Sequence, residues 1–301
     1  MGNGIRLGIS TCLLGERVRY DGQHKLDHFL VDTLGRHIEF VPVCPEVECG
    51  LPVPREAMRL VGEPDSPRLL THKTEIDHTA RMQAWAEKRL VSLESEQLCG
   101  FIFKSNSPSS GMERVKVYGG TGMSRKVGVG IWARAFMDRF PLLPVEEEGR
   151  LHDPALRENF IERVFVFSRW RDWVEATPTP RALVDFHTRH KLLVMAHAPR
   201  DLTALGRLVA GAGSGAASFA TVAQTYCQSL MAVLRHQATP RRNTNVLHHA
   251  MGYLKRALPP DEKQELLERI SQYHDGLIPL VVPIVLLQHY IRKYAVSYLA
   301  D

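Results

Sequence analysis

Three polar segments, far apart in the chain, have the residue types and the setting of one active site. They are Ser10-Thr11-Cys12-Leu13-Leu14-Gly15, Cys44-Pro45-Glu46 and Ser107-Pro108-Ser109-Ser110-Gly111. Each directly follows a short apolar run of strand character, namely Ile5 to Ile9, Phe40 to Val43 and Phe101 to Phe103. Because the carboxyl ends of parallel strands meet at one edge of a sheet, we expect the three segments to converge on one crevice.

Two of these segments carry a cysteine, Cys12 and Cys44. A thiolate in such a crevice can bind a soft metal or act as a nucleophile. The sequence contains no Cys-x-x-Cys pair, which excludes a zinc ribbon, and it lacks the closely spaced cysteines of a ferredoxin. Widely separated cysteines fit a cluster that the tertiary fold assembles, and they also fit two small buried hydrophobic side chains.

Composition limits the partners and the compartment. The formal net charge of +5 is a small excess, which permits contact with an anion or a nucleic acid without requiring it. The N-terminal residues lack the long apolar segment of a secretory signal, and the apolar stretch 277–287 is too short to span a bilayer, so we expect no membrane contact and a buried helix there. Five cysteines without an export signal indicate reduced thiols and a cytoplasmic protein.

The 301 residues are enough for two domains, and the pattern changes near residue 150. Before it, strands alternate with helices, which favours a small parallel-sheet, Rossmann-like α/β domain over residues 1–150. After it, apolar residues recur at helical spacing, which predicts an all-α domain over residues 151–301. The expected strands are 5–10, 38–43, 99–104 and 141–146, the expected helices 25–36, 75–97 and 131–139, and a hairpin-like stretch covers 114–131.

At the polar segments the chain resembles the bacterial thiouracil desulfidase (TudS-like) family. The second half is similar to the YbgA-type helical domain of unknown function that is often fused to it. The matching stretches of the first half are Ser10 to Gly15, Val18 to Gly22, Val43 to Val47, Gly50 to Arg55, Lys104 and Ser107 to Gly111. Those of the second half are Leu143 to Leu151, Arg157 to Ile161, His187 to His197, Asn245 to Tyr253 and Pro279 to His289.

The resemblance implies a specific chemistry. In that family three cysteines hold a [4Fe-4S] cluster and leave one iron open, and this iron removes sulfur from a thiolated pyrimidine such as 2-thiouracil without net redox change. By position the ligands would be Cys12, Cys44 and Ser110, with Cys12 and Cys44 as the metal-binding thiols. The resemblance also assigns proton handling to Glu46 and Ser107, whereas the residues alone allow Glu46 to be a carboxylate that only orients its loop. The substrate would be a small thiolated nucleobase or nucleotide.

The chain departs from the family at the third ligand. The family motif ends Ser-Pro-Ser-Cys-Gly, whereas residue 110 is serine, a harder and more basic donor than a thiol. Cys49 could supply a third sulfur, although we expect it to be a packing residue, as we do Cys99. A second hypothesis is therefore a degenerate, cluster-poor protein that binds a nucleotide or a nucleic acid. The resemblance further implies a shortened C-terminal tail.

The helical half gives weaker signals. His187 and His190 lie three residues apart, and His248 and His249 are adjacent, but none forms a His-Glu-x-x-His motif, and we expect packing or surface roles for them. Basic residues such as Arg241, Arg242 and Lys255 occur near Tyr253. If they line one groove, this domain could bind nucleic acid through phosphate contacts and base stacking, and otherwise they are solvated helix faces.

Overall fold

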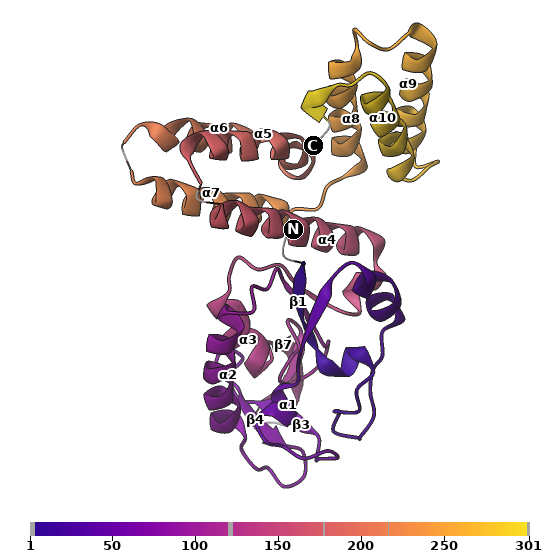
Figure 1. Ribbon diagram of the computed structural model, residues 1–301. Helices are drawn as coiled ribbons and strands as arrows, with labels where there is room; N and C mark the ends of the chain where they lie inside the picture. The colour runs from indigo at the N-terminus through magenta and orange to yellow at the C-terminus, as the bar shows by residue number, and fades with distance from the viewer. Residues whose placement is uncertain (1–3, 120–122, 177, 216, 300–301) are drawn as a thin grey trace. The chain divides into compact units, whose positions relative to one another are not determined.

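The computed structural model describes residues 4–119, 123–176, 178–215 and 217–299, and it divides into two compact units, Met1–Asp172 and Trp173–Asp301 (Figure 1). We call these unit 1 and unit 2. Their border lies within the helix α4 (Pro154–Glu175), whereas the sequence pattern changes near residue 150, and the predicted domain boundary at 150 stays a prediction. The predicted fold class, a parallel-sheet α/β region followed by a helical region, is confirmed.

Unit 1 is built on a four-stranded parallel sheet in the order β2-β1-β5-β8. Its strands are β1 (Arg6–Ser10), β2 (Glu39–Val43), β5 (Phe101–Phe103) and β8 (Val145–Glu147). Buried parallel strands read as continuous apolar runs, which is why the sequence predicts β1, β2 and β5. β8 contains Glu146 and Glu147, and the strand expected over 141–146 overlaps it only at residues 145 and 146. Gly8 of β1 is required at its position, because a Cβ there would lie 2.2 Å from Cδ2 of Phe101 on the neighbouring strand.

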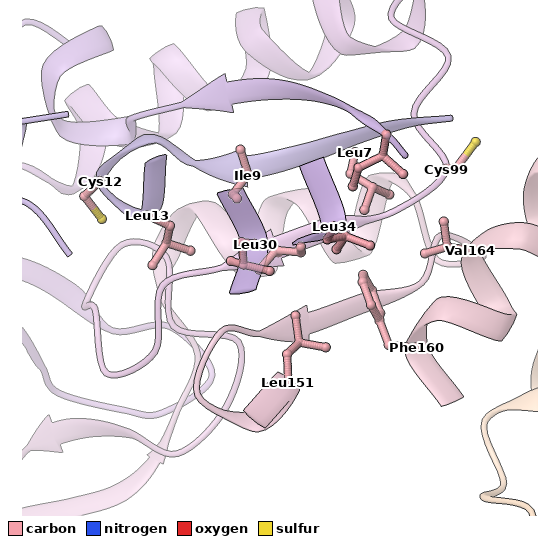
Figure 2. Close-up of a cluster of buried hydrophobic side chains, with 12 residues drawn as sticks. Leu7, Ile9, Cys12, Leu13, Leu30, Leu34, Cys99, Leu151, Phe160 and Val164 are labelled. Carbon is pink, nitrogen blue, oxygen red and sulfur yellow. The ribbon is translucent and has the colours of Figure 1, made fainter. Parts of the chain in front are cut away.

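Apolar clusters cover both faces of this sheet. On one face, Leu7 and Ile9 of β1 pack with Phe160 and Val164 of α4 and with Leu30 (Figure 2). On the other face, Phe101 and Phe103 pack against α2 (Thr79–Glu94) and α3 (Ile131–Arg139), through side chains such as Trp132 and Phe136. A sheet that is buried on both faces leaves its strand ends as the exposed place for polar chemistry.

Unit 1 has a second sheet in the order β4-β3-β6-β7, of which the sequence predicted only the hairpin formed by β6 and β7. The hairpin-like stretch forms β6 (Val115–Tyr118) and β7 (Ser124–Gly128), which pair antiparallel, while residues 120–122 lie outside the described part. The strands β3 (Met58–Val61) and β4 (Arg68–Thr71) were not predicted. The helix expected over 25–36 is wrong in type: Phe29–Thr33 is a π-helical turn and Leu34–Arg36 a 3₁₀ turn.

The described residues of unit 2 form helices. These are α5 (Pro180–His197), α6 (Leu202–Ala210), α7 (Phe219–Leu234), α8 (Pro240–Leu254), α9 (Pro260–His274) and α10 (Val281–Lys293). Thr179 and Thr239 cap α5 and α8, each followed by proline at the first helical position, as the sequence indicates. Leu287 of α10 is buried, but Val281 and Val285 are exposed, so this helix is buried only in part. Among the described residues no helix is both long enough and apolar enough to cross a membrane.

Candidate functional site

The three polar segments meet in one cavity of unit 1. Its volume is about 250 Å³, and it lies where β1, β2 and β5 end. The backbone amide of Lys104 donates a hydrogen bond to Ser10 Oγ over 2.9 Å, which ties the end of β5 to the end of β1. All five predicted site residues line the cavity, namely Cys12, Cys44, Glu46, Ser107 and Ser110. Other residues of its lining, which were not predicted as site residues, include Arg19, Tyr20, Arg55, Lys104 and Asn106.

Cys12 lies in a short 3₁₀ turn, η1 (Thr11–Leu14), directly after β1. Gly15 ends this turn with a φ of 93°, a conformation that glycine adopts without strain. The Cys12 side chain is buried, and burial raises the pKa of its thiol to about 11, a rise that the Lys104 ammonium opposes and the Glu46 carboxylate increases. Cys12 is therefore a neutral thiol at physiological pH in the free protein.

Cys44 occupies the N-cap position of the four-residue helix α1 (Pro45–Glu48). Its backbone amide donates to Glu48 Oε1 over 2.8 Å, and its thiol donates to Glu46 Oε2 over 3.8 Å. Burial raises the pKa of this thiol to about 12, and the Glu46 carboxylate adds to the rise. Both predicted metal-binding thiols are thus protonated and would release protons on binding a metal.

Glu46 connects the second and third segments. Its Oε1 accepts a hydrogen bond from Ser109 Oγ over 2.5 Å, and its Oε2 lies 3.8 Å from Arg55 Nη2. Arg55 in turn donates to the backbone oxygens of Val18 and Pro52, over 3.0 and 3.3 Å. A carboxylate that is largely withdrawn from solvent, with 13% of its side chain exposed, needs such partners, and here they fix its orientation toward the cavity.

Ser109 is a site residue that the sequence analysis did not single out. Its side chain is fully buried, at 0 % exposure, and its Oγ lies 2.9 Å from Ser107 Oγ and 3.4 Å from Ser110 Oγ. The motif contained Ser109, but its partner Glu46 lies 63 positions away, so only the tertiary structure reveals the contact.

Two neighbouring elements hold the third segment in place. At the start of α3, the backbone amides of Ile131 and Ala133 donate to the carbonyls of Pro108 and Ser109, over 3.2 and 3.1 Å. At the end of β8, Glu147 Oε1 accepts from the Met112 amide over 2.8 Å, and burial raises the pKa of this carboxyl. The loop that carries the serines is therefore fixed at both ends.

Glu148 fixes the residues between β5 and the third segment. Its carboxylate accepts the backbone amide of Ser105 over 2.7 Å and pairs with the Lys104 ammonium. Lys104 also donates to Ser105 Oγ over 3.0 Å. These contacts hold a cation at the cavity wall.

The donor set does not fit a cluster held by three thiolates. Two thiols and the Ser110 hydroxyl face the cavity, and Ser110 is 3 % exposed. Cys49 does not line the cavity, and its thiol donates to the backbone oxygen of Glu46 over 3.2 Å. Figure 2 shows Cys99 at the opposite end of the apolar cluster from Cys12. Across residues 4–119, 123–176, 178–215 and 217–299, no group of three His, Cys, Asp or Glu side chains could hold a metal ion.

Comparison with known proteins gives four similarities. Residues 7–148 match the family model of 2-thiouracil desulfurase, and residues 191–301 match that of a protein of unknown function, DUF1722. The uncharacterized protein YbgA of Escherichia coli K12 is 32% identical over 138 residues, which is 46% of this chain and 81% of that protein. A solved structure of the [4Fe-4S]-dependent thiouracil desulfidase TudS is 33% identical, over 51% of this chain and 97% of that one, with a TM-score of 0.42.

Proposed function

Because the chain belongs to the family that joins a 2-thiouracil desulfurase domain to a YbgA-like DUF1722 domain, we propose that unit 1 removes sulfur from a small thiolated pyrimidine. The family match supports a desulfurase function. The observation that carries the proposal is the convergence of Cys12, Cys44, Glu46 and Ser107 on one cavity from three distant segments. The family description names 2-thiouracil, and we extend the proposed substrate class to a nucleotide that contains it.

The proposed reaction exchanges the thiocarbonyl sulfur for the oxygen of water and releases hydrogen sulfide. It needs no oxidant or reductant, because the pyrimidine carbon keeps its oxidation state. Glu46 is the general base for the attacking water, assisted by Ser107. The cations Lys104 and Arg19 line the same cavity and stabilise the negative charge that develops on the departing sulfur.

A [4Fe-4S] cluster, as the family resemblance suggests, would contact Cys12 and Cys44. Position 110 is where the third thiolate is missing, since the Ser110 hydroxyl is a poor ligand for cluster iron. We therefore propose that the geometry for the substrate is present while the donor set for the cluster is incomplete. A cysteine at position 110 would complete this donor set, and a cluster held there would supply a Lewis-acidic iron for the departing sulfur.

The test compares the wild type with Ser110→Cys after anaerobic incubation with iron and sulfide. Each protein is mixed with 2-thiouracil, and both the loss of its absorbance and the release of sulfide are measured. We expect Ser110→Cys to release at least tenfold more sulfide than the wild type, and Cys12→Ala in the Ser110→Cys background to release none. If Ser110→Cys binds iron and still releases no sulfide, the desulfurase proposal fails.

Ser110 also favours a second function, a cluster-poor protein that binds a thiolated nucleobase without converting it. Calorimetric titration of the iron-free wild type with 2-thiouracil and with uracil tests this function. Saturable binding without turnover in the wild type would support it. None of the four similarities supports nucleic acid binding by unit 2, and the family that matches residues 191–301 is described as one of unknown function.

A further inference from the structure

The Ser109 hydroxyl lies between two groups that the proposed reaction uses. It is 2.5 Å from Glu46 Oε1 on one side and 2.9 Å from Ser107 Oγ on the other. Ser107 lines the cavity, whereas Ser109 is fully buried behind it. A substrate therefore contacts Ser107 and not Ser109.

The protons in this chain of hydrogen bonds have one arrangement. A hydroxyl carries a single proton, and Ser109 donates it to Glu46 Oε1. The Ser107 proton must then point to Ser109 Oγ, since Ser109 has none left to donate. Ser107 Oγ already accepts the Ser110 amide over 3.1 Å, and because Ser107 lines the cavity, its Oγ can accept one further hydrogen bond there.

We propose that Ser109 is a positioning residue that links Ser107 to Glu46 and makes Ser107 an acceptor for the attacking water. This inference rests on the proposed desulfurase function. The water gives a proton to Ser107, Ser107 gives its own to Ser109, and Ser109 gives its own to Glu46. Hydroxide then forms the new C–O bond at the thiocarbonyl carbon, and the electron pair of the C=S π bond moves to sulfur, which takes the proton held by Glu46. As the C–S bond breaks, the new hydroxyl becomes the carbonyl and its proton passes through Glu46 to the sulfur, which leaves as hydrogen sulfide with both protons of the water.

The position of Ser109 is fixed by the backbone and does not depend on the ligand. Its carbonyl accepts the Ala133 amide at the start of α3 over 3.1 Å. Gly130, the residue before α3, has no space for a side chain, because a Cβ there would lie 2.3 Å from the Ser109 carbonyl oxygen. The free protein therefore already holds the chain of hydrogen bonds in place.

A double-mutant cycle tests the link without any ligand. The melting temperatures of wild type, Ser109→Ala, Glu46→Ala and the double variant are compared. Because Ser109 and Glu46 share one hydrogen bond, which either substitution removes, we expect the double variant to lose less than the sum of the two single losses. Ser168→Ala, a buried serine on α4, is the matched control and should combine additively with Glu46→Ala. Additive losses for Ser109 and Glu46 would overturn the proposal.

Measurements of kcat and KM in the iron-loaded Ser110→Cys background test the positioning role of Ser109. We expect Ser109→Ala to lower kcat on the order of 100-fold with KM changed less than twofold, since the substrate does not contact Ser109. Ser107→Ala, and Ser107→Ala with Ser109→Ala, should lower kcat by the same factor, because both residues lie on one path. An unchanged kcat in Ser109→Ala refutes the positioning role alone. Absence of turnover in the Ser110→Cys parent refutes the proposed function and this role together.

Discussion

Replacing Glu46 with glutamine should make the Cys44 thiol more reactive. Burial raises the pKa of Cys44 to about 12, and the carboxylate adds to this rise. At pH 8 a thiol with that pKa is thiolate in roughly one molecule in ten thousand, against roughly one in ten for an ordinary cysteine with a pKa near 9. Cys44 in the wild type should therefore alkylate slowly, with a rate that rises about tenfold per pH unit.

The size of the change follows from the geometry. Glu46 Oε2 lies 3.8 Å from Cys44 Sγ, where an isolated charge would act with about 4 kcal/mol at an effective dielectric constant of about 20. Arg55 lies 3.8 Å from the same oxygen and offsets most of this effect. We expect Glu46→Gln to lower the pKa of Cys44 by about one unit, which is about 1.4 kcal/mol and a tenfold faster alkylation at pH 8.

The assay is alkylation with iodoacetamide between pH 7 and 10, resolved by residue with mass spectrometry. Cys227 in unit 2 is the internal control, because burial alone raises the pKa of its thiol to about 12 and Glu46 is not among its causes. Its rate should not change in Glu46→Gln. An unchanged or slower rate at Cys44 would refute the electrostatic reasoning, and a parallel rise at Cys227 would show general loosening of the protein instead.

Four further outcomes are expected. Ser110→Cys should bind several-fold more iron than the wild type after anaerobic reconstitution, measured by iron content and by the thiolate-to-iron absorbance, and equal iron in both would show that position 110 is not a ligand. Cys49→Ala should leave bound iron unchanged in either background, because the Cys49 thiol points to the Glu46 carbonyl, and loss of iron would mean that Cys49 replaces the missing ligand. Gly130→Ala should lower the free energy of unfolding by about 2 kcal/mol in urea denaturation, since its Cβ would overlap the Ser109 carbonyl, and no loss would contradict the tight fit. Glu148→Gln should cost about 2 kcal/mol in the same assay and increase proteolysis near residue 105, because Lys104 loses its ionic partner, whereas unchanged proteolysis would mean that the clamp does not hold the loop.

Much of the fold was predictable because its signals are local. The strands β1, β2 and β5 follow apolar runs, and Asp153-Pro154 marks the start of α4, where Asp153 Oδ1 accepts the amides of Ala155 and Leu156. The strands β3 and β4 escaped prediction because neither has more than two consecutive apolar residues. Pairing with β6 stabilises β3, and no local pattern reports that pairing.

The residues of the candidate site also fall into those that the sequence predicts and those that only the tertiary structure shows. Cys12, Cys44, Glu46 and Ser107 were predictable because each follows a strand that the sequence shows plainly, and parallel strands bring their ends together. Ser109 and Arg55 were not, because their importance comes from a partner far away in the chain. Both contact the Glu46 carboxylate, and these contacts depend on which residues the fold brings near Glu46 and not on their distance along the sequence.

The contacts that hold the loop of Ser107 to Gly111 do not involve the side chain of residue 110. Backbone and carboxylate bonds hold the loop, from Ile131 and Ala133 on one side and Glu147 and Glu148 on the other. The Ser110 amide contributes a bond to Ser107, but its side chain takes no part in these clamps. We therefore expect a cysteine at this position to change the donor chemistry of the cavity while the loop keeps its shape. On our proposal that position 110 is the third ligand, the identity of this side chain, and not the fold of the loop, decides whether a cluster binds.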